Sequence, residues 1–162
     1  MRLTILSVGR QTQSPEQALC ESYVAEAQGF ARKLGFQALE LQSIDASRAA
    51  TPAARMKDEA ARLITRIPAG AHRIALDERG KTRTSEEFAA HLGTLRDRAL
   101  RDAVFIVGGA DGLEAAFRDA AEERLAFGPQ TWPHQLVRAM LAEQIFRALT
   151  ILAGHPYHRG RA

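Results

Sequence analysis

The sequence predicts an α/β fold: a mostly parallel sheet of about five strands flanked by helices. Strand-like and helix-like segments alternate along the whole chain, and strands separated by helices need crossover connections, which join parallel strands. Residues 103–109, AVFIVGG, form an uninterrupted apolar run, as a strand covered on both faces requires. The 162 residues show no internal repeat and no linker, so we expect a single domain spanning residues 1–162.

The N-terminal half follows this pattern element by element. Residues 2–8, RLTILSV, alternate in the manner of a strand. A helix follows between the capping pair Ser14-Pro15 and the terminating Gly35. Residues 38–44 predict a second strand, and Thr51-Pro52 begins a second helix with one apolar face.

The C-terminal half continues the alternation through shorter elements, each bounded by turn or capping residues. In chain order they are a strand at 73–77 closed by a turn at 78–80, a helix capped at 85–87, the apolar strand, a helix at 111–123, and a strand at 124–128 followed by a proline loop.

The last predicted helix, residues 134–153, is apolar around most of its circumference. A helix of this kind is buried on more than one side. We therefore expect it to pack on the sheet and also on a second subunit, which predicts a homodimer. Its apolar stripe consists of Val137, Leu141, Ile145, Leu149 and Leu152.

Composition excludes several classes of protein. With 46% apolar and 25% charged residues the chain is typical of a globular domain, and it has no apolar run near the ~20 residues that span a bilayer. The N-terminus does not read as a signal peptide. A single cysteine, Cys20, excludes an internal disulfide. We expect a cytoplasmic protein without a membrane partner, and the net charge of +3 slightly favours an anionic partner.

Two loops are candidate ligand sites. The turn 108–112, GGADG, lies between a strand and a helix, where glycines let backbone amides approach an anion. It matches neither the dinucleotide nor the P-loop pattern, so a plain tight turn is an equal alternative. The loop 127–133, FGPQTWP, follows a strand and holds the only tryptophan between two prolines. It predicts either a rigid ligand loop at a strand end or a connection in which Trp132 fills the core.

The C-terminal stretch GHPYHRGRA is the third candidate. By charge alone a solvated tail is the simpler interpretation, and without a third ligand a metal is not expected there. Its side chains nevertheless suit chemistry on a nucleobase: a histidine with a pKa near ~6.5 is a general base, arginine binds phosphate or a developing anion, and tyrosine stacks on a base.

These segments together resemble a known family. FIVGGADGL from Phe105, AFGPQTWPHQLVRAMLAEQIFRA and HPYHR, with RIALDERGK upstream, are similar to the RlmH (YbeA-type) family of the SPOUT superfamily. These are S-adenosylmethionine-dependent methyltransferases that modify N3 of a pseudouridine in 23S ribosomal RNA, with the ribosome as partner. The resemblance covers the whole chain and is densest over its last ~60 residues.

The resemblance implies a trefoil knot in the C-terminal part, which local patterns do not reveal because knots are nearly absent from proteins. It also implies a homodimer. Two departures are visible: Ala110-Asp111 in the middle of the glycine turn, and an extension at 160–162. By position, the cofactor contacts would be Leu76, Gly108, Phe127, Gly128, Pro129, Gln130, Thr131 and Trp132.

Our own hypothesis assigns the chemistry on the ring to the tail. We expect His155 or His158 to act as base or donor, Tyr157 to stack, and Arg159 to balance the ring anion and contact RNA. Arg138 on the last helix is a further candidate for phosphate. We also expect Gly108→Val to abolish cofactor binding while leaving the fold largely intact. The alternatives are a ribosome-binding protein of the same fold without methyl transfer, and an enzyme acting on a small nucleotide.

Overall fold

The computed structural model describes residues 1–10 and 13–159, without the side chains of His158 and Arg159. Its centre is a five-stranded sheet in which every neighbouring pair is parallel, in the order β2-β1-β4-β3-β5. This confirms the predicted α/β class and strand count. The strands are β1 (Arg2–Val8), β2 (Ala38–Ile44), β3 (His72–Lys81), β4 (Asp102–Val107) and β5 (Glu123–Leu125).

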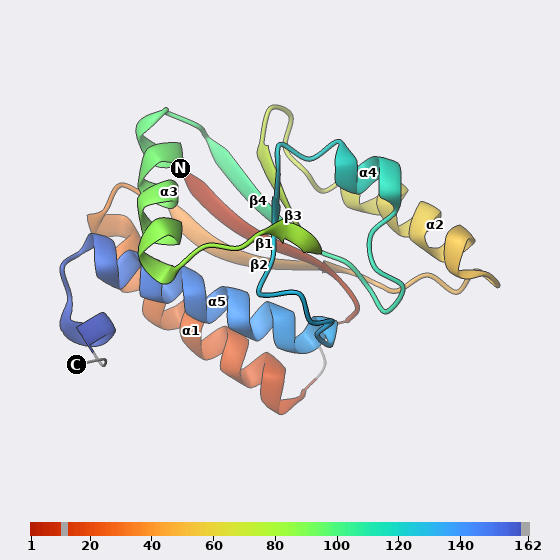
Figure 1. The fold of residues 1–162 in the computed structure, drawn as a ribbon, viewed down its shortest axis with the longest axis horizontal. Coiled ribbons are helices and arrows are strands. Elements are labelled where there is room, and N and C mark those ends of the chain that lie inside the picture. Colours follow the sequence, from red (N-terminus) through yellow and green to blue (C-terminus); the bar gives the residue numbers. More distant parts are fainter. Residues whose placement is uncertain (11–12, 160–162) are drawn as a thin grey trace.

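Helices cover both faces of the sheet (Figure 1). One face carries α1, α3 and α5, and the other carries α2 and α4. Among the described residues, no helix combines the length and the apolar character needed to cross a bilayer. The helices are α1 (Pro15–Lys33), α2 (Pro52–Ile64), α3 (Ser85–Asp97), α4 (Ala115–Asp119), α5 (His134–Leu152) and the short 3-10 turn η1 (Pro156–Arg159).

Helices α1, α2 and α3 begin where capping side chains satisfy free backbone amides, whereas α5 begins after Pro133 without a side-chain cap. Ser14 Oγ accepts a hydrogen bond from the Gln17 amide at 3.2 Å, as its sequence predicts. The cap of α3 is Thr84, whereas the sequence had suggested Ser85. Thr84 and Glu87 bond each other's backbone reciprocally at 3.1 and 2.8 Å, which satisfies two amides at once.

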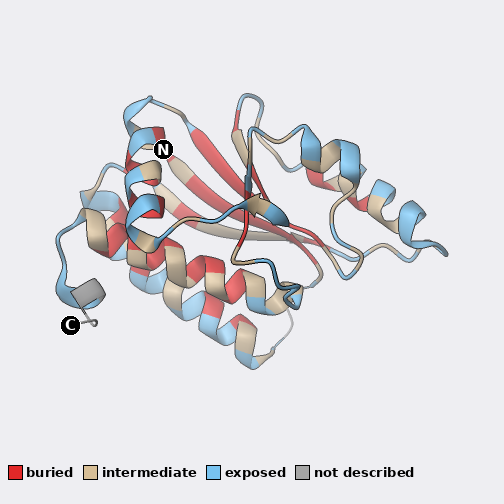
Figure 2. Cartoon of the chain, viewed as in Figure 1, coloured by how far each residue is buried: buried red, intermediate tan, exposed pale blue. Residues whose placement is uncertain are grey.

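Two apolar clusters hold the layers together, one on each face of the sheet (Figure 2). The larger joins β1 and β4 to α1, α3 and α5, and Phe105 and Leu141 are fully buried in it. The smaller joins the opposite face to Leu63 of α2 and Phe117 of α4. All six residues of β4 are buried, which confirms the prediction made from its apolar run.

The end of β3 differs from the sequence prediction. The strand runs on through Lys81 instead of closing in a turn at 78–80. Leu76 and Lys81 both pair with Leu125, because β3 bends around the short β5 and meets it twice. At Gly80 an added Cβ would lie 2.7 Å from the backbone of Arg124 and Leu125, so this crossing needs a glycine. The fifth strand is correspondingly shorter than expected, since the chain leaves the sheet after Leu125.

Candidate functional site

A cavity of about 770 Å³ opens at the carboxyl ends of β3 and β4, beside the segment that follows β5. In open α/β sheets this edge is where ligands bind. Three stretches supply most of its wall: 76–79, 107–113 and, apart from Pro129, 125–133. The start of α5, with His134 and Val137, closes it.

Seven of the eight residues expected to contact a cofactor line this one cavity. Pro129 is the exception and is exposed within the same loop. The strand end, the glycine turn and the proline loop are far apart in the sequence, and the fold places them around a common space. Trp132 is 42% exposed, so it does not fill the core. The seven are Leu76, Gly108, Phe127, Gly128, Gln130, Thr131 and Trp132.

The glycine turn is tight for reasons internal to the chain. The Gly112 amide donates to the Gly109 carbonyl at 3.0 Å, and Gly112 has φ +84°, a conformation that favours glycine. A Cβ on Gly108 would lie 2.7 Å from the Gly112 carbonyl carbon. Gly108→Val therefore disturbs the turn itself, and that the rest of the fold stays largely intact remains a prediction.

Asp111, in the middle of that turn, is anchored from α2. The Arg55 guanidinium donates to both carboxylate oxygens, at 2.6 and 3.0 Å. This hydrogen bonding lowers the pKa of Asp111, so the pair is charged at neutral pH. The sequence shows no sign that residues 56 positions apart pair, and both partners were missed there.

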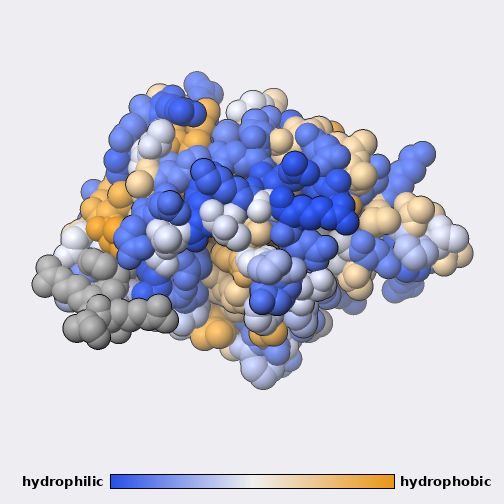
Figure 3. Space-filling view, in the orientation of Figure 1, coloured by the Kyte–Doolittle hydropathy of each residue, from blue (hydrophilic) through white to orange (hydrophobic). Residues whose placement is uncertain are grey.

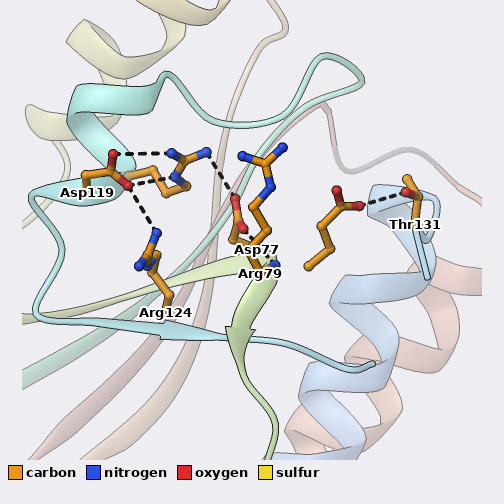
Figure 4. A network of polar contacts seen from close by, with 7 residues as sticks. Asp77, Arg79, Asp119, Arg124 and Thr131 are labelled. Carbon is orange, nitrogen blue, oxygen red and sulfur yellow. Dashed lines mark hydrogen bonds and ion pairs between the residues drawn. The ribbon is translucent and has the colours of Figure 1, made fainter. Parts of the chain in front are cut away.

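An acidic and basic network forms another wall of the cavity (Figure 4). Arg118 bridges Asp77 and Asp119, with contacts of 3.4 and 2.9 Å. Glu78 accepts a hydrogen bond from Thr131 at 2.7 Å and so ties β3 to the proline loop. The sequence had suggested that Asp77 ends a strand and that Glu78 begins a turn. The fold instead places two carboxylates beside the ligand space.

Two basic side chains near the start of α5 have different surroundings. Burial and the neighbouring charge of Arg138 lower the pKa of His134, which lines the cavity. Arg138 itself is 4% exposed and donates to Ser7 Oγ at 3.3 Å. A guanidinium buried in this way does not present itself to RNA phosphate, so the structure argues against that predicted role for Arg138.

The tail lies at the other end of α5. The His155 ring packs edge-on against Phe30 with 5.2 Å between ring centroids, and Tyr157 packs against Phe146 at 4.7 Å. Because α5 has 19 residues, about 28 Å of helix separates the tail from the cavity. Within one chain the fold does not bring the two together. The side chains of His158 and Arg159, which the sequence also assigned to catalysis, lie outside the described residues.

Comparison with known proteins places the chain in a family. The family model described as "Predicted SPOUT methyltransferase" matches residues 1–158. The chain belongs to the SPOUT methyltransferase family. The match includes the cavity stretches and extends into the tail, so the superfamily expected from the sequence motifs is confirmed.

Curated relatives in this family match at nearly full length. The protein named Ribosomal RNA large subunit methyltransferase H from Rhodopseudomonas palustris strain HaA2 is 51% identical over 159 residues, covering 98% of this chain and 99% of the relative. The protein of the same name from Nitrobacter hamburgensis is 49% identical over 160 residues, covering 99% and 100%. Among solved structures, a probable methyltransferase from Bordetella pertussis covers 91% of this chain and 96% of its own, with 19% identity and a TM-score of 0.49.

Proposed function

We propose that this protein transfers a methyl group from S-adenosylmethionine to N3 of a pseudouridine in 23S ribosomal RNA, with the assembled ribosome as substrate. The observation that carries the proposal is the identity of about half the residues, over nearly the whole chain, with proteins named Ribosomal RNA large subunit methyltransferase H. The cavity at the strand ends supports it, because it provides a ligand site of suitable size and chemistry.

The cavity suits S-adenosylmethionine in volume and in charge. Ligand pockets span about 300–1,000 Å³, and this one measures about 770 Å³. Leu76, Val107 and Val137 give it apolar surface, and its wall carries the carboxylates of Asp77 and Glu78 together with the guanidinium groups of Arg79 and Arg118. A bound S-adenosylmethionine supplies an electrophilic methyl on a positively charged sulfur, which neighbouring carboxylates stabilise.

We also propose the trefoil knot that the resemblance implies. The support is the crossing at Gly80, where the backbone of Arg124 and Leu125 passes so close that a Cβ does not fit. The double pairing of Leu125 with Leu76 and Lys81 puts β5 inside the bend of β3. A chain held this way keeps the cavity loop 126–133 in a fixed position without a ligand.

A homodimer is the third part of the proposal. A groove of about 1,380 Å³ runs along α5, and it includes the exposed apolar side chains of Leu19, Leu136 and Tyr157. Figure 3 shows small hydrophobic patches among hydrophilic surface in the lower half of the view, where α1 and α5 lie. The residues 125–128 line the groove as well as the cavity. A second copy seated in the groove therefore lies next to the cofactor loop.

This arrangement gives the distant tail a role on the partner's cavity. Because one chain holds its tail and cavity at opposite ends of α5, the tail of each subunit acts at the site of the other. There His155 or His158 accepts the N3 proton, Tyr157 stacks on the ring, and Arg159 balances the ring anion. Holding the reactants in line lowers the activation barrier by about 7–11 kcal/mol, and a positioned base increases the rate by a further factor of about 100 to 10,000.

Mass spectrometry of ribosomal RNA from cells lacking this protein tests the function. We expect one methyl group to disappear from one pseudouridine of 23S RNA and to return when the gene is restored. Unchanged RNA contradicts the proposal and favours the alternative, a ribosome-binding protein without methyl transfer. Calorimetry with S-adenosylmethionine separates the two independently, since a pure binder of ribosomes does not need the cofactor.

Mixed dimers test the action of the tail on the partner. One subunit carries a disrupted cavity, Gly108→Val, and the other ends after Ala153. Each homodimer is expected to be inactive, whereas the mixed dimer regains one intact site made of one cavity and the other subunit's tail. If the mixture stays inactive although mixed dimers form, the tail does not act across the interface.

A further inference from the structure

Three side chains with metal-binding atoms meet at the edge of the sheet away from the cavity mouth. His72 begins β3, His91 lies on α3, and Glu123 begins β5. Both histidine Nε2 atoms approach the same carboxylate oxygen, Glu123 Oε1, at 2.7 and 2.8 Å. All three donor atoms lie within 4.8 Å of one another, on side chains that are only 15–21% exposed.

We propose that His72, His91 and Glu123 form a binding site for a zinc ion. Two imidazoles and one carboxylate are a recognised zinc ligand set that leaves the fourth tetrahedral position for water. The carboxylate alone does not carry this inference, because the two imidazoles are the ligands that distinguish zinc from calcium or magnesium.

The geometry contains an atom that hydrogen bonding within the chain leaves unsatisfied. His91 Nε2 is buried and makes no hydrogen bond of good geometry among the described residues. Its contact with the chain is Glu123 Oε1 at 2.8 Å, and His72 Nε2 approaches the same oxygen at 2.7 Å. A buried nitrogen whose contact is poorly aligned is incompletely satisfied, and a metal ion between the three donors would satisfy it.

The spacing needs only a small adjustment. Zinc bonds of 2.0–2.1 Å in a tetrahedron place donor atoms about 3.3 Å apart. The distances from the two nitrogens to Oε1, now 2.7 and 2.8 Å, must therefore increase by about 0.6 and 0.5 Å. Rotation of the imidazole and carboxylate side chains supplies shifts of this size without moving the strands.

Arg83 completes the surroundings of the site. It holds the other carboxylate oxygen, Glu123 Oε2, at 2.8 Å. This contact fixes the carboxylate plane and leaves Oε1 for the metal, which is the usual arrangement for a ligand oriented by an outer partner. The positive charge of Arg83 opposes a cation, and the neutral imidazoles and the charged Glu123 must outweigh it.

The site would join three elements near the cofactor loop. Glu123 lies two residues before Leu125, where the wall of the cavity begins. β5 has only three residues and is the edge strand, so it has few backbone hydrogen bonds to hold it. A zinc ion at Glu123 fastens this strand to β3 and α3, and we therefore expect zinc to stabilise the fold and not to take part in methyl transfer.

Calorimetry of the full chain, first treated with a chelator, tests the site with zinc sulfate as the probe. We expect one zinc ion per chain and a higher midpoint of thermal unfolding when zinc is present. Cobalt is expected to give the visible absorption of a tetrahedral site, and magnesium is expected not to bind. Failure of the wild-type chain to bind zinc overturns the proposal.

Matched variants locate the binding. Removing a residue that only orients a metal ligand costs about 10- to 100-fold in metal affinity. Because His91 and Glu123 are ligands themselves, we expect His91→Gln or Glu123→Gln to weaken zinc binding at least tenfold. Glu122→Gln is the control, because Glu122 is adjacent but pairs with Arg73. Zinc affinity that stays unchanged in His72→Gln/His91→Gln overturns the assignment.

A third comparison distinguishes this site from the histidines of the tail. We expect His155→Gln/His158→Gln to leave zinc affinity unchanged, and loss of binding in that variant would move the metal to the tail and contradict the proposal. If a variant at the cluster unfolds without metal, the visible spectrum of cobalt bound to the wild-type chain tests the site instead. A tetrahedral spectrum supports the three ligands, and an octahedral spectrum or no spectrum contradicts them.

Discussion

Shortening two apolar side chains in the groove is expected to weaken the homodimer while leaving each subunit folded. Leu19 and Leu136 are 49% and 39% exposed in one chain, and both line the groove along α5. Large apolar side chains that gather along one exposed groove, unlike single exposed ones, mark a surface that a partner covers. The perturbation is the double variant Leu19→Ala/Leu136→Ala.

The magnitude follows from the exposed fractions. Fully burying a leucine contributes about 1.5–3 kcal/mol, so covering the exposed parts of both side chains contributes about 1.3–2.6 kcal/mol per subunit. In a two-fold dimer the same residues of both subunits lie in the interface, so each substitution acts twice. The double variant therefore loses about 2.6–5.3 kcal/mol of association free energy, which raises the dimer dissociation constant about a hundredfold to several thousandfold.

Sedimentation equilibrium over a range of protein concentrations measures this dissociation constant. Ile64→Ala is the matched control, because Ile64 is 55% exposed but lies on α2, across the sheet from the groove (Figure 1). We expect the control to associate like the wild type. An unchanged dissociation constant in the double variant, with the wild type dimeric, would refute the assignment of the groove as the interface.

Three further predictions concern single groups. Burial lowers the pKa of His134 below 6.5, so its neutral form stabilises the fold above pH 6.5, and this contribution is lost as the pH falls below that value. Chemical denaturation should show the free energy of unfolding decreasing over this pH range, and His134→Gln should reduce that decrease. Asp111→Asn removes the charged partner of Arg55 that holds the glycine turn, so calorimetry should show weaker binding of S-adenosylmethionine while circular dichroism stays native; equal affinity contradicts the role of the pair. Burial raises the pKa of Cys20 to about 11, so a thiol reagent at pH 8 should label it only after unfolding, and rapid labelling of the native chain would show that this region opens.

The sequence predicted the fold in most of its parts because the strands are marked by local patterns. The apolar run of β4 and the serine-proline start of α1 each determine their element through nearby residues alone. The end of β3 was predicted wrongly for the opposite reason. Its continuation through Lys81 depends on pairing with Leu125, 44 positions later in the numbering, and no local pattern records that contact.

The candidate site divides in the same way. The glycine turn and the proline loop were found because glycine and proline restrict the backbone where they stand. The contacts between Arg55 and Asp111, and between Glu78 and Thr131, join distant segments and were not found. The proposed zinc ligands also come from three separate elements, and their spacing in the sequence matches no metal-binding motif. For this reason the sequence drew attention only to the histidines of the tail as possible metal ligands.

Methyl transfer to ribosomes by the purified protein tests the central claim most directly. Ribosomes from a strain lacking the enzyme are incubated with the protein and labelled S-adenosylmethionine, and the modified nucleotide is located by mass spectrometry. The account predicts one methyl group per ribosome, on N3 of a pseudouridine in 23S RNA, and a loss of several orders of magnitude in rate when the chain ends after Ala153. Label elsewhere, or no label at saturating cofactor, contradicts the proposed reaction, and near-normal turnover by the shortened chain contradicts the role of the tail.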